Sequence, residues 1–244
     1  MTTDFDYSVR VKNGAGWRAF DRARLMISVG QPYHEGKKLQ AVVDWLNRNP
    51  EIRQVHVSVN DLLQRHNHLA VGMPEQQAAA TALAEGTSWI ERNADIIARI
   101  KAPTTITRWE DWLEHPDFPG TSTALAAYAD RDIVFEQTLN TDAHTLAERK
   151  VKRGEPITNP NRLVAHSHDY VTEELSVFAL QGRKFPAAEV YPGSNLASAQ
   201  YLVGKKLPDP IEPLARRHFT RIDFAHVNVS ANHAPRPART LDCK

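Results

Sequence analysis

Ser28 is the first residue whose type and setting suggest chemistry. It directly follows an apolar run, residues 25–27, and precedes a break at Gly30 and Pro32. In open α/β sheets, ligands bind beyond the carboxyl ends of the strands, so a serine at a strand end is placed to meet one. A serine hydroxyl is a weak nucleophile until neighbouring groups activate it. The chain must therefore supply partner groups near the same strand end.

Three further residues are candidates for these partners. Tyr191 ends a second strand-like run, residues 187–192, and is expected to face the same crevice as Ser28. Tyr170 and Glu174 lie four residues apart in a helical pattern, which places both side chains on one face of the helix. Together the four residues would offer a serine hydroxyl, two phenols and a carboxylate.

Each candidate also has an ordinary structural explanation when it is taken alone. Serine is a common helix cap, so Ser28 fits the start of the helix that follows it. A Tyr and a Glu at helical spacing are typical of a surface pair. Tyr191 before Pro192 fits a buried ring at a strand end. It is the joint occurrence of the four residues, in this order, that favours a site.

Alternating strand and helix patterns must position these residues. Residues 24–29 are strand-like, residues 34–49 carry apolar side chains at helical spacing, and residues 53–59 alternate as a strand. This order predicts a βαβ unit with a parallel sheet and a right-handed crossover. The remaining patterns predict helices over 75–100, 122–153, 160–182 and 195–203, and strands over 104–107, 187–192 and 218–230.

The patterns predict a single α/β domain over residues 24–230, with a mostly parallel sheet flanked by helices. Residues 1–23 are polar and lack a sustained period, so we expect a loosely ordered lead-in. Residues 231–244 carry the composition of a flexible tail.

Composition excludes several classes of protein. The 244 residues carry a formal net charge of +1, so any binding of nucleic acid must depend on local patches. The single cysteine, Cys243, excludes an internal disulfide and a cysteine-based zinc site, and favours a reducing compartment. The chain has no apolar stretch of membrane-spanning length and no signal-peptide pattern near its start, so we expect a cytoplasmic protein with no membrane partner.

Three segments resemble the tRNA-dependent cyclodipeptide synthases. These are ISVGQPYHEGKKL (27–39), YVTEE (170–174) and AEVYPGSNLASAQYLVG (188–204), and the resemblance extends from about residue 24 to 229. Members of that family join the aminoacyl groups of two aminoacyl-tRNAs into a diketopiperazine. The resemblance implies a Rossmann-like domain similar to the catalytic domain of class I tyrosyl- and tryptophanyl-tRNA synthetases. It implies aminoacyl-tRNAs as substrates, and no ATP or other cofactor.

The resemblance also implies roles for the four candidates. The nucleophilic serine of the family falls on Ser28, its Tyr-x-x-x-Glu pair on Tyr170 and Glu174, and its second tyrosine on Tyr191. An aminoacyl-tRNA is already an activated ester, so the enzyme has to supply positioning and a transient acceptor. Glu174 is the natural partner of the substrate α-ammonium, and Tyr191 can relay a proton during ring closure.

Three positions divide the family into branches. One branch has Asn, Tyr and His, and the other has a variable residue followed by Tyr and Pro. This chain has Gln31, Tyr191 and Pro192, which is similar to the second branch. Met26 stands where the first branch often has glycine, so we expect it to narrow the amino-acid pocket or to reshape its wall.

Further substrate contacts are expected at two loops. Gly30 and the backbone amides of the turn after it are candidates for holding the oxyanion. The segment NDLLQRHN, residues 60–67, follows the second predicted strand and would place Asn60, Asp61, Gln64 and Arg65 near the same crevice.

Basic clusters are the candidates for contacts with tRNA phosphates, which give salt-dependent affinity with little sequence information. The first branch of the family uses a strongly basic helix, whereas residues 75–101 of this chain are of mixed charge. The better candidates are Arg149, Lys150, Lys152 and Arg153, with Lys37 and Lys38 beside the serine loop. A solvated helix face is the ordinary explanation of the cluster at 149–153.

Other chemistries match the sequence less well. His66, His68, His166, His168 and Asp169 form no familiar metal signature, so we expect no metal centre. Ser28 lacks the G-x-S-x-G setting of a serine hydrolase, and no Walker glycine precedes the Gly-Lys pairs. The alternative function is a non-catalytic tRNA- or RNA-binding module on the same fold.

Overall fold

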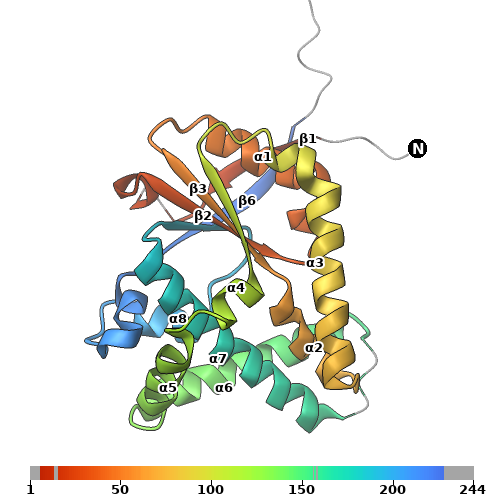
Figure 1. Cartoon of the computed structure of the whole chain (residues 1–244), viewed down its shortest axis with the longest axis vertical. Helices are drawn as coiled ribbons and strands as arrows, with labels where there is room; N and C mark the ends of the chain where they lie inside the picture. Colours follow the sequence, from red (N-terminus) through yellow and green to blue (C-terminus); the bar gives the residue numbers. More distant parts are fainter. Residues whose placement is uncertain (1–5, 14–15, 156, 158, 228–244) are drawn as a thin grey trace, which may run out of the picture.

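Six strands form one central sheet with helices on both of its faces, as the computed structural model shows (Figure 1). The structure describes residues 6–13, 16–155, 157 and 159–227. The strands are β1 (Asp6–Val11), β2 (Arg22–Ser28), β3 (Gln54–Asn60), β4 (Thr104–Arg108), β5 (Ala188–Tyr191) and β6 (His218–Val227). The α-helices are α1 (Gly36–Asn47), α2 (Arg65–Ala70), α3 (Glu75–Ile97), α4 (Trp109–Leu113), α5 (Phe118–Ala129), α6 (Ile133–Lys152), α7 (Pro160–Lys184) and α8 (Ala197–Leu202). Short 3-10 helices are η1 (Gly16–Ala19), η2 (Pro32–His34), η3 (Leu62–Gln64) and η4 (Asp209–Arg216).

The sheet is mostly parallel, which confirms the predicted α/β class. Its order is β1-β6-β5-β2-β3-β4, and only β1 runs antiparallel to its neighbour. From β2 the chain continues outward through β3 and β4, whereas β5 and β6 add to the other side of β2. The strand order therefore reverses between β2 and β5, where open α/β sheets bind their ligands.

Alternation along the strands divides the core into two layers. Leu25 and Ile27 of β2 pack with α1 and α3, whereas Met26 between them packs on the other face with α7. Figure 1 shows α1 and α3 at one side of the sheet and α5 to α8 at the other. The sheet is thus covered on both faces, as parallel sheets usually are.

The long helix from Pro160 is confirmed. Asn159 caps α7 by accepting a hydrogen bond from the backbone N–H of Arg162 at 3.1 Å, and proline occupies the first turn. The single helix predicted over 122–153 is wrong, because the chain forms α5 and α6 there. Asp132 breaks the run, since its carboxylate accepts hydrogen bonds from the N–H groups of Val134 and Phe135 and starts α6.

The beginning of the chain is more ordered than the sequence predicts. In the predicted lead-in, residues 6–11 form β1, which pairs with β6, and Trp17 is buried against Trp45 with ring centres 5.1 Å apart. A polar edge strand has only one neighbour, so it shows no continuous apolar pattern. The predicted flexible tail, 231–244, lies outside the described residues, as does Cys243.

Among the residues that the structure describes, no helix has the length and apolar character needed to span a membrane.

Candidate active site

Ser28 and Tyr191 meet at the switch point of the sheet. Ser28 is the last residue of β2 and Tyr191 the last of β5, and the serine Oγ lies 3.1 Å from the tyrosine hydroxyl. The same tyrosine hydroxyl lies 3.1 Å from that of Tyr33. Three hydroxyls thus form a chain along which a proton can be passed.

A buried histidine holds the backbone of Ser28. The N–H of Ser28 donates a hydrogen bond to Nδ1 of His34 at 2.9 Å, and His34 is fully buried. Burial lowers the pKa of His34 to about 4, so the ring is neutral near pH 7 and Nδ1 can accept. The backbone oxygen of His34 in turn accepts from Nε1 of Trp89 at 2.9 Å. The turn after β2 is therefore fixed from within the core.

The turn after β2 directs Gly30 and Gln31 to different surfaces. Gly30 has φ 84°, a left-handed conformation that favours glycine, and lines a shallow depression with Glu85 and Arg92 of α3, away from Ser28. Gln31 donates its N–H to the backbone oxygen of Ser28 at 3.2 Å and lines the cavity around the serine. Gly30 shapes the turn and forms no part of that cavity's wall.

Two adjacent spaces, which share several lining residues, lie at the hydroxyls. The outer cavity has a volume of about 380 Å³, and its lining includes Ser28, Gln31, Tyr33, Gln64, Tyr170, Tyr191 and the cluster Arg149, Lys150, Lys152 and Arg153. The inner pocket, about 120 Å³, has a lining that includes Met26, Asn60, Glu174, Phe178, Arg217 and Phe219. Tyr33, Tyr170 and Tyr191 line both spaces, so the tyrosines form the boundary between them.

Tyr170 and Glu174 face these spaces from one side of α7, as their spacing predicts. The hydroxyl of Tyr170 accepts a hydrogen bond from Nε2 of Gln64 at 3.4 Å. Burial raises the pKa of Tyr170 and of Tyr191 well above the usual value, so both phenols stay protonated.

Glu174 has an unusual environment for a carboxyl group. Within the described part of the chain it makes no hydrogen bond and no ion pair. Burial raises its pKa to about 8, against the opposing charge of Arg217, while Glu189 and Asp142 add to the rise. A carboxyl group that lines a pocket without a partner can bind a cation or exchange a proton near neutral pH.

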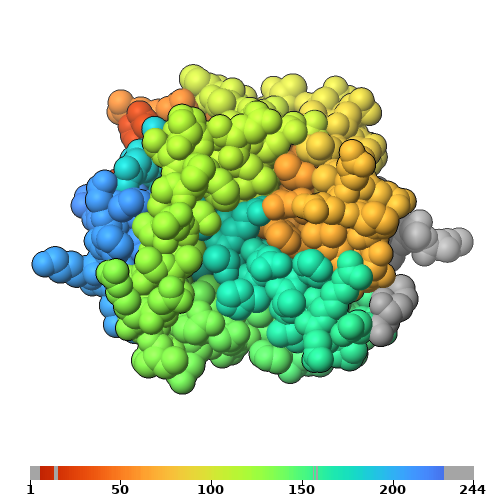
Figure 2. Space-filling model, turned by 60° about the horizontal axis from the view of Figure 1, so that its bottom comes forward, coloured from red at the N-terminus to blue at the C-terminus, as the bar shows by residue number. Residues whose placement is uncertain are grey.

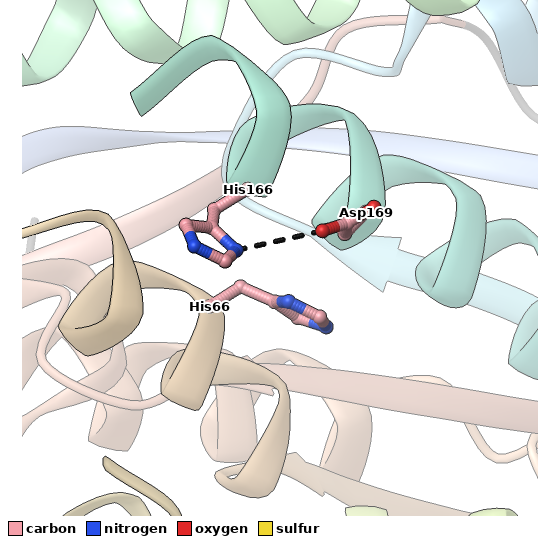
Figure 3. Close-up of side chains that lie close together, drawn as sticks. All are labelled: His66, His166 and Asp169. Atoms are coloured by element: carbon pink, nitrogen blue, oxygen red, sulfur yellow. Dashed lines mark ion pairs between the residues drawn. The ribbon is translucent and has the colours of Figure 1, made fainter. Parts of the chain in front are cut away.

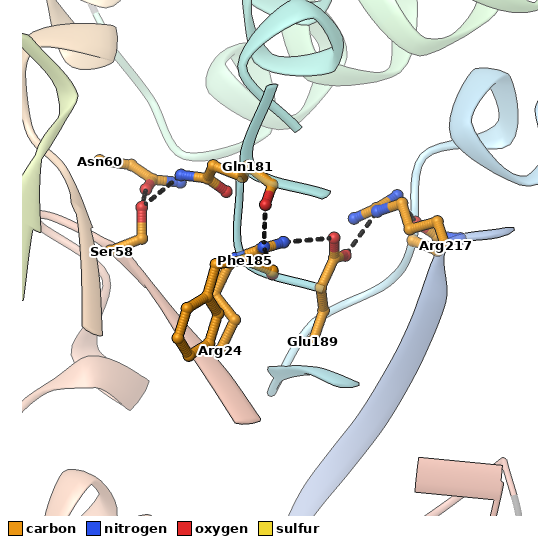
Figure 4. Close-up of polar contacts among 8 residues, drawn as sticks. Arg24, Ser58, Asn60, Gln181, Phe185, Glu189 and Arg217 are labelled. Carbon is orange, nitrogen blue, oxygen red and sulfur yellow. Dashed lines mark hydrogen bonds and ion pairs between the residues drawn. The ribbon is translucent and has the colours of Figure 1, made fainter. Parts of the chain in front are cut away.

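A buried polar network holds Arg217, which lines the inner pocket (Figure 4). Glu189 accepts from Nη1 of Arg24 at 3.1 Å through one oxygen and from Nε of Arg217 through the other. Arg24 also donates to the backbone oxygen of Gln181 at 2.8 Å. Burial lowers the pKa of Arg24 to about 10, and the charge of Glu189 opposes this. A larger cavity of about 610 Å³ lies beside this network under η4, but Ser28 does not line it.

The network continues to Asn60 on β3. Nε2 of Gln181 donates to Oγ of Ser58 at 2.8 Å, and that hydroxyl donates to Oδ1 of Asn60 at 3.2 Å. Figure 4 shows this chain running from α7 to β3. Asn60 thus lines the inner pocket, as predicted, with its amide held in place from behind.

Asp61 does not reach either space, so its predicted place at the substrate is wrong. It is fully buried and accepts hydrogen bonds from Nε of Arg108 at 2.6 Å and from the N–H of Trp109 at 3.1 Å. A Cβ at Gly86 would come within 2.3 Å of its carboxylate, so α3 packs directly on it. Asp61 joins β3, β4 and α3. Pro192, one residue beyond β5, lines neither space.

The predicted basic residues separate into two groups. Arg149, Lys150, Lys152 and Arg153, at the end of α6, line the outer cavity. Lys150 is largely buried, and desolvation lowers its pKa to about 8.

Lys37 and Lys38 lie elsewhere, on the side of α1 that faces β1. Lys37 pairs with Asp6 at 3.3 Å, and Nζ of Lys38 lies 5.3 Å from the ring centre of Tyr7. Neither lysine lines the cavity around Ser28, although Ser28 is close in sequence. The helix carries them toward the edge of the sheet.

Several residues of the site were missed by sequence reasoning. Tyr33 and His34 belong to the segment quoted above, PYHEG, but nothing in their spacing reveals the contacts to Tyr191 and Ser28. Arg217 follows η4, far from the other residues in sequence, and only the fold brings it to the inner pocket.

Glu173 beside Glu174 is a structural residue. It accepts hydrogen bonds from Arg65 and, at 2.8 Å, from Nε1 of Trp109. Burial favours its neutral form, but the hydrogen bonds from His66 and Arg65 hold its pKa at about 2. The two adjacent glutamates therefore differ in charge near neutral pH.

Comparison with known proteins identifies the fold. No protein-family model matches the sequence, and no curated relative matches it. Solved structures do match. A cyclodipeptide synthase from Fluoribacter dumoffii superimposes with a TM-score of 0.80 at 23% identity, over 92% of this chain and 100% of that one.

Two further solved structures are similar over most of their length. The cyclodipeptide synthase from Candidatus Glomeribacter gigasporarum bound to Phe-tRNAPhe has a TM-score of 0.63 at 17% identity, over 91% of this chain and 93% of that one. A Mycobacterium tuberculosis protein, described as showing that cyclodipeptide synthetases are related to type I tRNA synthetases, has a TM-score of 0.64 at 13% identity, over 92% and 96%. The chain shares the fold of these proteins.

Proposed function

We propose that this protein is a cyclodipeptide synthase, which joins the aminoacyl groups of two aminoacyl-tRNAs into a diketopiperazine without ATP. The observation that carries the proposal is the position of Ser28, whose Oγ lies 3.1 Å from the Tyr191 hydroxyl where a basic outer cavity meets the pocket of Glu174. The fold shared with several cyclodipeptide synthases supports it.

In the first step, Oγ of Ser28 attacks the ester carbonyl of one aminoacyl-tRNA. The bond between the carbonyl carbon and the ribose oxygen breaks, the ribose oxygen takes up the serine proton, and the first tRNA leaves. The amino acid is now an ester of Ser28. The Tyr191 hydroxyl, at hydrogen-bond distance from Oγ, is suited to carry the proton between the two oxygens.

The ring forms in two amide-forming steps. The amine of the serine-bound aminoacyl group attacks the ester of the second aminoacyl-tRNA, which releases the second tRNA. The amine of the added residue then attacks the Ser28 ester, closes the six-membered ring and returns the proton to Oγ. Each step exchanges an ester for an amide, so no further source of energy is required.

Glu174 is proposed to bind the α-ammonium group of the first amino acid. At about 4 Å and an effective dielectric near 20, such a pair is worth on the order of 4 kcal/mol before desolvation is subtracted. Because its pKa is about 8, the same carboxylate can take up a proton when the ammonium must become a nucleophilic amine. Tyr170, on the same face of α7, helps to enclose the group.

The outer cavity is proposed to receive the end of the tRNA. Arg149, Lys152 and Arg153 can pair with phosphates while the aminoacyl ester meets Ser28, which lines the same cavity. Gln31, Tyr191 and Pro192 match the branch with a variable residue, Tyr and Pro. Met26 lines the inner pocket and would limit the size of the first aminoacyl side chain.

Incubation of the purified protein with a mixture of charged tRNAs tests the proposal. We expect cyclic dipeptides by mass spectrometry, and an aminoacyl adduct on Ser28 after acid quenching. Ser28→Ala should abolish both. Ser176→Ala is the matched control, since Ser176 is buried in α7, donates to the backbone oxygen of Thr172 at 2.9 Å and lines neither space.

The same experiment separates the enzyme from a non-catalytic RNA-binding module. A module would shift the mobility of tRNA but would release no cyclic dipeptide from any charged tRNA. An aminoacyl adduct that persists in Ser28→Ala would contradict the assignment of the nucleophile.

A further inference from the structure

His66, His166 and Asp169 come together outside the proposed active site (Figure 3). His66 belongs to α2, and the other two residues lie on consecutive turns of α7. Their ligand atoms all lie within 4.8 Å of one another. In Figure 3 the two imidazoles and the carboxylate face a common space between the helices.

Hydrogen bonding fixes which nitrogen of His66 faces this space. Nε2 of His66 lies 3.2 Å from Oε2 of Glu173, and the Glu173 carboxylate also accepts hydrogen bonds from Nη1 and Nη2 of Arg65. A carboxylate engaged by a guanidinium is an acceptor, so the proton of His66 is on Nε2. Nδ1 is left with a lone pair, and it is buried with no hydrogen-bond partner in the described part of the chain.

The side chain of His66 is 9% exposed, so its unpartnered nitrogen cannot be explained by contact with bulk water. An imidazole that donates one N–H to a carboxylate and directs its other nitrogen to a common point is the arrangement found around protein-bound zinc. Nδ1 of His166 is also buried and lacks a good hydrogen bond, since its distance of 3.4 Å to Oδ2 of Asp169 is long.

That long distance fits a metal ion better than a hydrogen bond. Tetrahedral zinc with bonds of about 2.0 to 2.1 Å places two of its ligand atoms about 3.4 Å apart. His166 and Asp169 already have this separation. The ligand nitrogen of His66 lies within 4.8 Å of the other two ligand atoms, so its approach must shorten by at most about 1.4 Å, and one coordination position would stay open for water.

We propose that His66, His166 and Asp169 bind a zinc ion that joins α2 to α7. Two imidazoles and one carboxylate suit this borderline metal, whose sites take nitrogen and oxygen ligands at tetrahedral positions. Asp169 has a side chain that is 56% exposed, so the ion has a route from solvent. Figure 2 shows the surface on which α2, in orange, meets α7, in teal.

The proposed ion would stabilise one wall of the outer cavity. Tyr170 follows Asp169 directly, and its ring lies 6.4 Å from that of His66, edge to face. The ion would therefore act on the position of Tyr170 without contacting the reacting atoms. The inference is independent of the proposed synthase activity, because it is tested by metal binding alone.

Zinc binding is measured by calorimetric titration of the full chain after treatment with a chelator, and by the visible spectrum with Co²⁺ in place of Zn²⁺. We expect one ion per chain and the intense absorption of tetrahedral Co²⁺. His166→Ala and Asp169→Asn should each weaken binding by at least about tenfold and remove that absorption. His66→Ala should do the same.

Two histidines close by provide matched controls. His68, also on α2, lies 3.3 Å from Glu85, and His168, also on α7, lies 3.7 Å from Glu136. Their alanine variants should bind zinc like the wild type. Melting curves in chelator identify a variant that fails to fold. If a histidine variant fails to fold, Asp169→Asn tests the inference, because the side chain of Asp169 is partly exposed. A wild type that binds no zinc at micromolar concentration, or ligand variants that bind as tightly as the controls, would overturn the inference.

Discussion

Replacing Glu174 by glutamine should stabilise the folded protein at alkaline pH while it greatly lowers the activity. The folded carboxyl has a pKa of about 8, raised chiefly by burial, against 4.5 for the ordinary group. At a pH between these two pKa values, the folded state holds a proton on Glu174 that the unfolded state has lost. The wild type therefore loses stability as the pH rises from 4.5 toward 8, and the loss is complete above the folded pKa.

The size of the effect follows from the same two values. Each pH unit over which only the unfolded carboxyl is ionised lowers the free energy of unfolding by about 1.4 kcal/mol. The folded and unfolded pKa values differ by about 3.5 units, so the loss is at most about 5 kcal/mol. Glu174 lines an open pocket, and solvent there screens its charge. We therefore expect Glu174→Gln to be about 2 kcal/mol more stable than the wild type at pH 8.5, and nearly equal to it at pH 5.

Urea unfolding at the two pH values measures this difference directly. Other groups titrate equally in both proteins, so the comparison isolates position 174. Exposed Glu91 of α3 provides a control, and Glu91→Gln should differ little from the wild type at either pH. If Glu174→Gln is destabilised equally at both pH values, the carboxylate has a partner in the folded protein, and the argument for a free ammonium-binding group is refuted. Product formation by the variant should fall by roughly 100-fold, equivalent to about 3 kcal/mol of lost interaction.

Three further predictions concern the surroundings of Ser28. Tyr191→Phe should slow product formation by about 100-fold, since proton relay contributes at least that much, while tRNA binding is unchanged; an unchanged rate would exclude the relay. The double variant Arg149→Glu/Lys152→Glu should bind tRNA more weakly. The slope of log K against log salt concentration, measured by filter binding from 50 to 200 mM salt, should fall in magnitude by about 1.4 to 1.8. An unchanged slope would show that neither side chain contacts a phosphate. Asp61→Asn should lower the free energy of unfolding by about 3 kcal/mol, because it leaves the guanidinium of Arg108 without its carboxylate partner. The KM for aminoacyl-tRNA should stay unchanged, and a raised KM would indicate that Asp61 contacts the substrate.

The sequence predicted the fold where local patterns are strong. The βαβ unit, the long helices α3 and α7 and the strand before Tyr191 all follow from periodicity, capping and proline. Prediction from the sequence failed where one side chain or a distant partner strand determines the local structure. Asp132 ends one helical run and starts another, and the edge strand β1 depends on its partner β6, more than two hundred residues later.

The candidate site shows a similar division. The positions of Ser28 and Tyr191 follow from the rule that ligands bind at strand ends, and helical spacing places Tyr170 and Glu174 on one face. Spacing does not show which way a loop turns. Asp61 is one residue beyond Asn60 on β3, yet it points to the opposite side and pairs with Arg108.

Charged residues inside strands were the least predictable part. Arg24 directly precedes the apolar run 25–27, and Glu189 stands between Ala188 and Val190. A charged residue in a strand usually faces solvent. Both are almost completely buried, because α7 covers the polar face of the sheet. No pattern in one sequence distinguishes a strand face turned to water from one covered by a helix that is distant in sequence.

Burial and the neighbouring charges together set the protonation state of Glu174. Glu189 is shared between two guanidinium groups, those of Arg24 and Arg217, so the network carries an excess positive charge. Burial raises the pKa of Glu174, and the carboxylates of Glu189 and Asp142 add to the rise, so together they outweigh the lowering by Arg217. Without a ligand the carboxyl is therefore mostly protonated at pH 7. An ammonium group entering the pocket would favour the ionised form, and the proton released would be available to the hydroxyl chain that ends at Ser28.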